Sequence, residues 1–378
     1  MIRLMLIILF FLISLLAVFK APQYHLWLLA IAVTEFPWVF ISIVLILLAA
    51  GYWAQKYQLA STLIGLVALI LFLSPIVRAQ VVASTLKQNF TAVFGSDSID
   101  KLQPPFTFGG MFKGDPKPVA VKTLTYVKYA DTAMTLDFYP AQTNGKRPCV
   151  IVVHGGSWSS GDSKQLPELN SHLANAGYNV ASVNYRMAPK WQCPAPVEDI
   201  QNTLKYLRQH ADELKIDTNN FVLLGRSAGA QIALLAAYTL HDAAIKGVVD
   251  FYGPADMVWG YSVPSSPLIM DSRKVMRNYL GGPYQQVPQN YVASSPIEFI
   301  DRQSPPTLII HGGNDVLVAY EHSRRLDEKL DQYGIKHYWL KLPGATHGFD
   351  FNINGPGGQL STYAVDRFLK AVCQPVPR

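Results

Sequence analysis

The sequence predicts an α/β protein, in which a mostly parallel sheet carries helices on both faces and is preceded by apolar N-terminal helices. From residue 121 onward, apolar runs rich in β-branched residues alternate with amphipathic runs, as in strand–helix–strand units. Some apolar runs, such as 149–156, are continuous, which indicates strands covered on both faces. Three long uncharged stretches precede residue 80, and they predict a separate helical region.

The N-terminal region, residues 1–80, is expected to be embedded in a membrane. Each uncharged stretch is close to the length of about 20 residues that a bilayer-spanning helix needs. The first stretch would also suit a signal peptide or a core helix, but no clear small-x-small cleavage site follows it. Residues 24–33 are too short to cross alone, so they would extend the second span or lie in the interface. The predicted spans cover about residues 3–20, 36–55 and 58–77.

The orientation of these spans depends on few charges. Arg3 and the amino terminus favour a cytoplasmic N-terminus, whereas Lys20, Arg78 and Lys87 favour the opposite arrangement. With three spans, the first arrangement places the C-terminal domain outside the cytoplasm. We expect an integral membrane protein with a slight preference for an extracytoplasmic domain.

The overall charge argues against a nucleic-acid partner. The net charge is +6, but the sequence contains no basic run and no acidic block. No metal-binding motif and no glycine-rich phosphate loop is present, so we expect no cofactor. Three scattered cysteines indicate neither a disulfide framework nor a zinc site, and nothing in the sequence predicts an oligomeric state. These cysteines are Cys149, Cys193 and Cys373.

The remaining chain divides into a linker and a globular domain. Residues 81–120 combine a possible amphipathic helix with a Gly/Pro-rich stretch, which indicates a linker. The domain covers 121–376 and begins with a predicted hairpin around Asp131. Residues 254–300 are rich in Pro, Gly and Tyr and interrupt the strand–helix alternation. Because long insertions of this kind often cover a site, we expect a cap here.

Three chemically reactive residues follow predicted strands. Ser227 comes directly after FVLLG and one arginine, Asp315 follows PTLIIHGGN, and His347 follows KHYWLKLPGAT. Ligands in open parallel sheets bind at the carboxyl ends of the strands. A serine hydroxyl needs a base as it attacks, an imidazole has a suitable pKa, and a carboxylate orients that imidazole. His337 and Asp350 are the alternatives for the base and the carboxylate, but His337 falls within a strand and Asp350 lies too close to His347 in sequence.

The turn that carries Ser227 supports a nucleophile over a simple helix cap. Gly225 and Gly229 flank it, and a side chain at either position is expected to clash in so tight a turn. The backbone N–H of Ala228, at the start of a helix, and those of the turn at 155–157 could stabilise a developing oxyanion.

These segments together resemble the α/β-hydrolase fold. The similarity lies in GRSAG, HGGSW, NYR, HGGND and GATHGFD, covers roughly residues 120–375, and is closest to the BD-FAE (feruloyl-esterase-like) and hormone-sensitive-lipase-like carboxylesterases. The resemblance implies that Ser227 is the nucleophile, His347 the general base and Asp315 its carboxylate. It also implies an oxyanion hole at Gly156, Ser157 and Ala228, with Gly155 opening the turn. The lipase-like members usually have HGGG, so Ser157 must adopt backbone dihedrals that glycine usually supplies.

Several residues are candidates for substrate binding. Trp158 belongs to the HGGSW segment, and Arg226 could either select an anionic substrate or form a salt bridge within the fold. Trp259 and Tyr261 of the insertion could line an acyl or aryl pocket or pack the cap.

Taken together, we expect a membrane-anchored serine carboxylesterase that acts on a small or lipid-like ester. Plant isoprenylcysteine methylesterases resemble this union of membrane helices with an HGG-x-W domain. An arylformamidase or a peptidase with the same triad is the alternative. A non-catalytic interaction protein is less consistent, because all three triad residues are retained.

Overall fold

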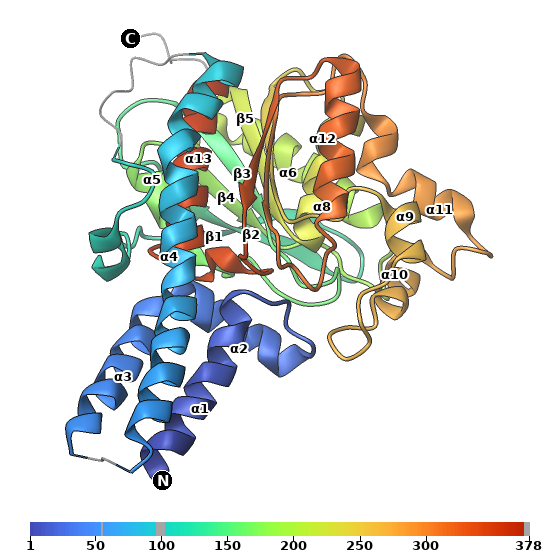
Figure 1. Ribbon diagram of the computed structural model, residues 1–378. Helices are drawn as coiled ribbons and strands as arrows, with labels where there is room; N and C mark the ends of the chain where they lie inside the picture. The colour runs from blue at the N-terminus through green and yellow to red at the C-terminus, as the bar shows by residue number, and fades with distance from the viewer. Residues whose placement is uncertain (54–55, 96–102, 374–378) are drawn as a thin grey trace.

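The computed structural model describes residues 1–53, 56–95 and 103–373 of the chain. A sheet of eight strands, in the order β1-β2-β4-β3-β5-β6-β7-β8, forms the centre of the C-terminal domain (Figure 1). The strands are β1 (Lys122–Lys128), β2 (Ala133–Tyr139), β3 (Arg147–Val153), β4 (Asn179–Val183), β5 (Ile216–Arg226), β6 (Ile245–Phe251), β7 (Thr307–Gly312) and β8 (His337–Leu342).

The sheet is parallel from β4 to β8, and only β1 and β2 add antiparallel pairings. The hairpin predicted around Asp131 is the pair β1–β2. In the central strand β3, Ile151 pairs with Ala181 on one side and Leu223 on the other. Successive side chains of a strand point to opposite faces, and every β3 residue from Pro148 to Val153 is buried. Both faces of the sheet are therefore covered, as the continuous apolar run predicts.

Helices cover the two faces in two groups. One hydrophobic core contains Ile151 of β3 together with apolar residues of α6, α8 and α12, and the other contains Val150 together with residues of α4, α5 and α13. The predicted α/β architecture is thus confirmed. The flanking helices of the domain are α5 (Pro167–Asn175), α6 (Ala195–Gln209), α7 (Ala211–Leu214), α8 (Ala228–Thr239), α12 (Glu321–Tyr333) and α13 (Pro356–Val372).

The insertion between β6 and β7 forms three short helices beside the sheet (Figure 1). Its helices pack on the same core as α6 and α8, through Met257, Met276 and Tyr291. This segment corresponds to the predicted cap at 254–300. The helices are α9 (Met257–Ser262), α10 (Ser272–Leu280) and α11 (Pro288–Ala293).

The N-terminal helices form a bundle that projects from the domain (Figure 1). Among the described residues, α4 is the one unbroken helix that is long and apolar enough to cross a membrane, while α2 and α3 qualify only as a pair bent by 85°. The helix α1 is shorter, because the chain leaves helical geometry near residue 18. The helices are α1 (Ile2–Ser14), α2 (Tyr24–Glu35), α3 (Pro37–Ala49) and α4 (Gln58–Phe94).

The boundary predicted at residues 80–81 falls within α4. This helix continues from the bundle onto the domain, where Ala83, Leu86 and Phe90 join the core beside α13. The apolar spacing of these residues, three or four apart, explains the continuity. The predicted linker therefore begins with helix. Residues 54–55 of the second predicted span, 96–102 of the linker and 374–376 of the domain lie outside the described residues.

Candidate active site

Ser227 occupies the sharp turn between β5 and α8. Its backbone adopts φ 53° and ψ −119°, a conformation that L-residues rarely take and that is typical of functional sites. The Ser227 N–H donates a hydrogen bond to the carbonyl of Phe251 in β6. This contact anchors the turn to the neighbouring strand and leaves the Ser227 side chain partly exposed.

Glycine is required on both sides of this turn. A Cβ added to Gly225 would lie 2.3 Å from the carbonyl oxygen of Gly229, and a Cβ added to Gly229 would lie 2.3 Å from that of His154. These atoms belong to the backbone and cannot move aside cheaply. The G-x-S-x-G pattern therefore has a steric origin here, as expected from the sequence.

His347 and Asp315 form a close buried pair. His347 Nδ1 lies 2.7 Å from Asp315 Oδ2, and the Asp315 side chain is fully buried. The other oxygen of Asp315 accepts hydrogen bonds from the N–H groups of Leu317 and Val318. This arrangement holds the imidazole in one orientation and leaves its Nε2 for a proton transfer.

A second histidine supports the carboxylate and was missed from the sequence. His311 Nε2 lies 3.2 Å from Asp315 Oδ2, and His311 Nδ1 lies 2.6 Å from Ser323 Oγ. Burial opposes ionisation of Asp315, but the two histidines outweigh burial and hold the pKa of this carboxyl below its usual range. The HGGND segment contains His311, and its position four residues before Asp315 is the signal that could have identified it.

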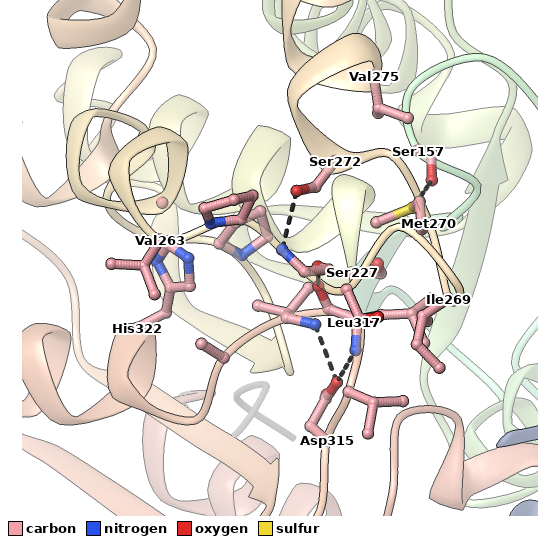
Figure 2. Close-up of a pocket in the computed structure, with 18 of the residues that line it drawn as sticks. Ser157, Ser227, Val263, Ile269, Met270, Ser272, Val275, Asp315, Leu317 and His322 are labelled. Atoms are coloured by element: carbon pink, nitrogen blue, oxygen red, sulfur yellow. Dashed lines mark hydrogen bonds between the residues drawn. The ribbon is translucent and has the colours of Figure 1, made fainter. Parts of the chain in front are cut away.

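Ser227 and His347 line a common cavity. In the described part of the chain, Ser227 Oγ forms no hydrogen bond to His347, and both residues border a cavity of about 590 Å³. Apo enzymes often show long or poorly aligned catalytic contacts that tighten when substrate binds. His347 also packs against the ring of Tyr252, at 4.3 Å between centroids. Asp315 joins Ser227 in lining a second cavity of about 430 Å³ (Figure 2).

The predicted oxyanion donors differ in their availability. Gly155 N–H donates to Gln165 Oε1 at 2.8 Å, so this donor is occupied. In contrast, the N–H groups of Gly156, Ser157 and Ala228 have no acceptor among the described residues. Ser157 adopts φ 55°. It therefore has the positive φ that is expected where the lipase-like relatives have a third glycine.

Trp158 and Arg226 are held by contacts within the fold. Trp158 stacks on Tyr279 and donates from Nε1 to Gln231 at 2.9 Å, and the residue also borders the 430 Å³ cavity. The Arg226 side chain is only 2% exposed and pairs through Nε with Asp350 at 2.5 Å. Arg226 therefore forms a salt bridge within the fold, which is one of the two roles expected for it; the other was selection of an anionic substrate.

Trp259 and Tyr261 border neither of the cavities at Ser227. They border a separate hollow together with Arg325, whereas Met257 and Gly260 of the same helix border the cavity at Ser227. The ring of Tyr261 instead packs against Tyr291 at 5.0 Å between centroids, and the ring of Trp259 packs against His322 at 4.9 Å. Of the two roles that the sequence leaves open for Trp259 and Tyr261, the structure therefore favours packing of the cap over lining of the cavities at Ser227.

One group of acidic and imidazole side chains in the described chain could approach a cation. It consists of Asp327, Asp331 and His337. His337 Nε2 already lies 3.1 Å from Asp327 Oδ1, and the group borders neither cavity at Ser227. It therefore has no place in the chemistry of Ser227.

The strand order is that of an α/β-hydrolase fold. The strained serine turn and the Asp–His pair lie where this fold carries its reactive groups. The chain belongs to the BD-FAE family, whose model matches residues 136–330. An esterase from Pyrobaculum calidifontis superposes with a TM-score of 0.59 at 23% identity, over 79% of this chain and 93% of that chain.

Two Mycobacterium tuberculosis proteins are similar in sequence. Esterase LipC is 29% identical over 64% of this chain and 63% of its own length. The probable carboxylic ester hydrolase LipM is 28% identical over 60% of this chain and 55% of its own length. The chain thus spans between about half and two thirds of the length of these relatives.

Proposed function

We propose that this protein is a serine carboxylic-ester hydrolase that acts through an acyl-enzyme on Ser227. The observation that carries the proposal is the Asp315–His347 pair at 2.7 Å beside a serine held at φ 53°, with Ser227 and His347 lining one cavity. The names of LipC and LipM support the same reaction class.

In the proposed acylation, Ser227 Oγ attacks the ester carbonyl carbon while His347 Nε2 accepts the hydroxyl proton. The N–H groups of Gly156, Ser157 and Ala228 donate to the oxyanion that forms. The intermediate collapses when His347 returns the proton to the leaving alcohol, and the acyl group remains on Ser227. Asp315 stays ionised throughout and stabilises the imidazolium.

Deacylation repeats these steps with water. His347 removes a proton from a water molecule as it attacks the acyl carbonyl, and Ser227 leaves with that proton. The two cavities that meet at Ser227 give the acyl and alcohol parts of an ester separate spaces.

We further propose that the N-terminal bundle anchors the protein in a membrane. Several apolar side chains on the outside of α1, α3 and α4 are exposed, including Leu9, Ile46 and Ile70, and an exposed apolar surface of this extent is costly in water. The charged side chain of Arg3 is buried and bonds the carbonyl of Leu47. The N-terminus lies at the end of the bundle far from the domain (Figure 1), so a cytoplasmic Arg3 places the domain outside the cytoplasm.

The esterase proposal is tested with the full chain in detergent and p-nitrophenyl esters of increasing chain length. Ser227→Ala is expected to lose essentially all hydrolysis and all labelling by a fluorophosphonate probe. Ser262→Ala is the matched control, since Ser262 is exposed and borders neither cavity. Unchanged hydrolysis in Ser227→Ala would reject the nucleophile. Activity on formanilides without activity on esters would replace the esterase with an arylformamidase.

A further inference from the structure

The 590 Å³ cavity at Ser227 is partly built by the N-terminal region. One of its walls consists of α2 and the residue that follows it, so the catalytic domain alone does not complete the site. No comparable contribution is expected from a helix that serves only as an anchor. The residues of this wall are Tyr24, Trp27, Leu28, Ile31, Ala32 and Phe36.

The helix α2 is fixed to the segment that carries His347. Trp27 Nε1 donates to the carbonyl of His347 at 3.0 Å. A Cβ added to Gly348 would lie 3.2 Å from Ile31 Cδ1, so the helix touches the next residue of the same loop. The wall is therefore in direct contact with the residue proposed as the general base.

Both ends of α2 are also bonded to the domain. At its start, Tyr24 N–H donates to the carbonyl of Leu268 in the cap insertion at 3.0 Å. At its end, Oε2 of the buried Glu35 side chain accepts from Gly357 N–H, and the Glu35 carbonyl accepts from Asn352, each at 2.9 Å. These bonds hold the helix in a defined position against the domain.

The chemistry of this cavity suits an uncharged apolar group. Arg226 carries the one formal charge among its described lining residues, and Asp350 already neutralises it. On its other side, α2 contacts α3 and α4 of the bundle. Tyr24 and Leu28 are 44% and 43% exposed, so the wall reaches the surface beside the bundle.

We propose that α2 is a specificity-determining wall, and that the substrate is a lipid-like ester with one long apolar arm lying along α2. This inference rests on the proposed function, because the arm is placed relative to a carbonyl attacked by Ser227. Each methylene buried along the wall is expected to raise kcat/KM by up to about fourfold. Long-chain esters are therefore preferred over acetates.

The test compares kcat/KM of the full chain in detergent for two ester series. One series lengthens the acyl chain of p-nitrophenyl esters from acetate to decanoate, and the other lengthens the alcohol of alkyl acetates. Leu28→Trp places a larger side chain at the cavity. Leu63→Trp is the matched control, because Leu63 is 56% exposed on α4 and borders neither cavity.

Leu28→Trp is expected to lower the long-to-short ratio of kcat/KM at least about tenfold in one series. Leu28→Ala is expected to shift the preference toward longer chains, and Leu63→Trp is expected to change neither ratio. Ratios that are the same in Leu28→Trp, Leu28→Ala and the wild type would overturn the role of α2 and leave the esterase proposal standing. A wild type that hydrolyses no member of either series would overturn both.

Discussion

At the residue scale, the site depends on backbone conformations that cost energy. Ser227 and Ser157 both have φ near +55°, a region in which a non-glycine residue is strained by roughly 1–3 kcal/mol. Both residues border the 590 Å³ cavity, so the strained positions coincide with the candidate site. The fold holds both residues in place through contacts such as the Ser227–Phe251 hydrogen bond.

Asp315→Asn is expected to lower kcat/KM by roughly 10³- to 10⁴-fold. The amide cannot stabilise a charged imidazolium, and its NH₂ group would favour the wrong tautomer of His347. The measurement is ester hydrolysis by detergent-purified protein, with thermal unfolding as a check that the variant folds. Asp212→Asn, at an exposed ion pair with Lys146, is the control and should change little. A loss below tenfold in Asp315→Asn would argue against the proposed triad.

At the element scale, the start of α8 packs closely against the end of β3. Gly229 permits this contact, because a Cβ at that position would lie 2.3 Å from the carbonyl oxygens of both Val153 and His154. The G-x-S-x-G pattern around Ser227 predicts this close contact, because the tight turn that requires glycine is encoded within five consecutive residues.

Gly229→Ala is expected to destabilise the protein by about 3 kcal/mol or more, because the new methyl meets rigid backbone on two sides. Gly109→Ala is the matched control, since nothing lies within 4 Å of a Cβ at that position. The measurement is the urea concentration at the unfolding midpoint. Equal midpoints for the two variants would contradict the steric explanation.

A buried carboxyl on β6 predicts a pH-dependent stability. Burial raises the pKa of Asp250 to about 7, partly offset by His311. One Asp250 oxygen accepts from Gly253 N–H, and the other has no partner among the described residues. The folded state therefore keeps a proton that the unfolded chain releases near pH 4, so stability falls as the pH rises toward 7 and then levels off.

Between pH 5 and pH 8, the wild type is expected to lose on the order of 3 kcal/mol through this group. Asp250→Asn cannot ionise, so it should lack this component. Urea unfolding of both proteins at the two pH values measures the difference. The same pH dependence in both proteins would show that Asp250 is not the titrating group.

An element could be predicted from the sequence when the residues that specify it lie close together in the chain. The strands and the residues at their carboxyl ends follow from apolar runs and turn residues, so Ser227, Asp315 and His347 were brought to one end of the sheet as expected. The placement of α2 over His347 depends on contacts more than 300 residues apart in sequence, such as Trp27 with His347. No periodicity within residues 24–33 encodes such a contact.

At the scale of the whole molecule, the bundle and the domain are joined into one unit. The helix α4 contributes to the bundle at one end and to the domain core at the other, and α2 adds a wall to the site. Removal of residues 1–84 would therefore expose core surface of the domain and open the cavity.

Membrane anchoring predicts that identical substitutions at equally exposed leucine and valine positions have different effects. Leu66 of α4 and Val121 at the start of the domain are each 45% exposed. In water, an arginine at either position would be tolerated, whereas at the centre of a spanning helix it costs about 2.5–3.5 kcal/mol. Leu66→Arg is therefore expected to reduce the fraction of protein that stays with membranes after alkaline carbonate extraction, and Val121→Arg is not. Release of the wild type and both variants alike into the supernatant would exclude a spanning bundle. Alkaline carbonate removes proteins that only contact the membrane surface, whereas a protein with a helix inserted in the bilayer stays with the membranes.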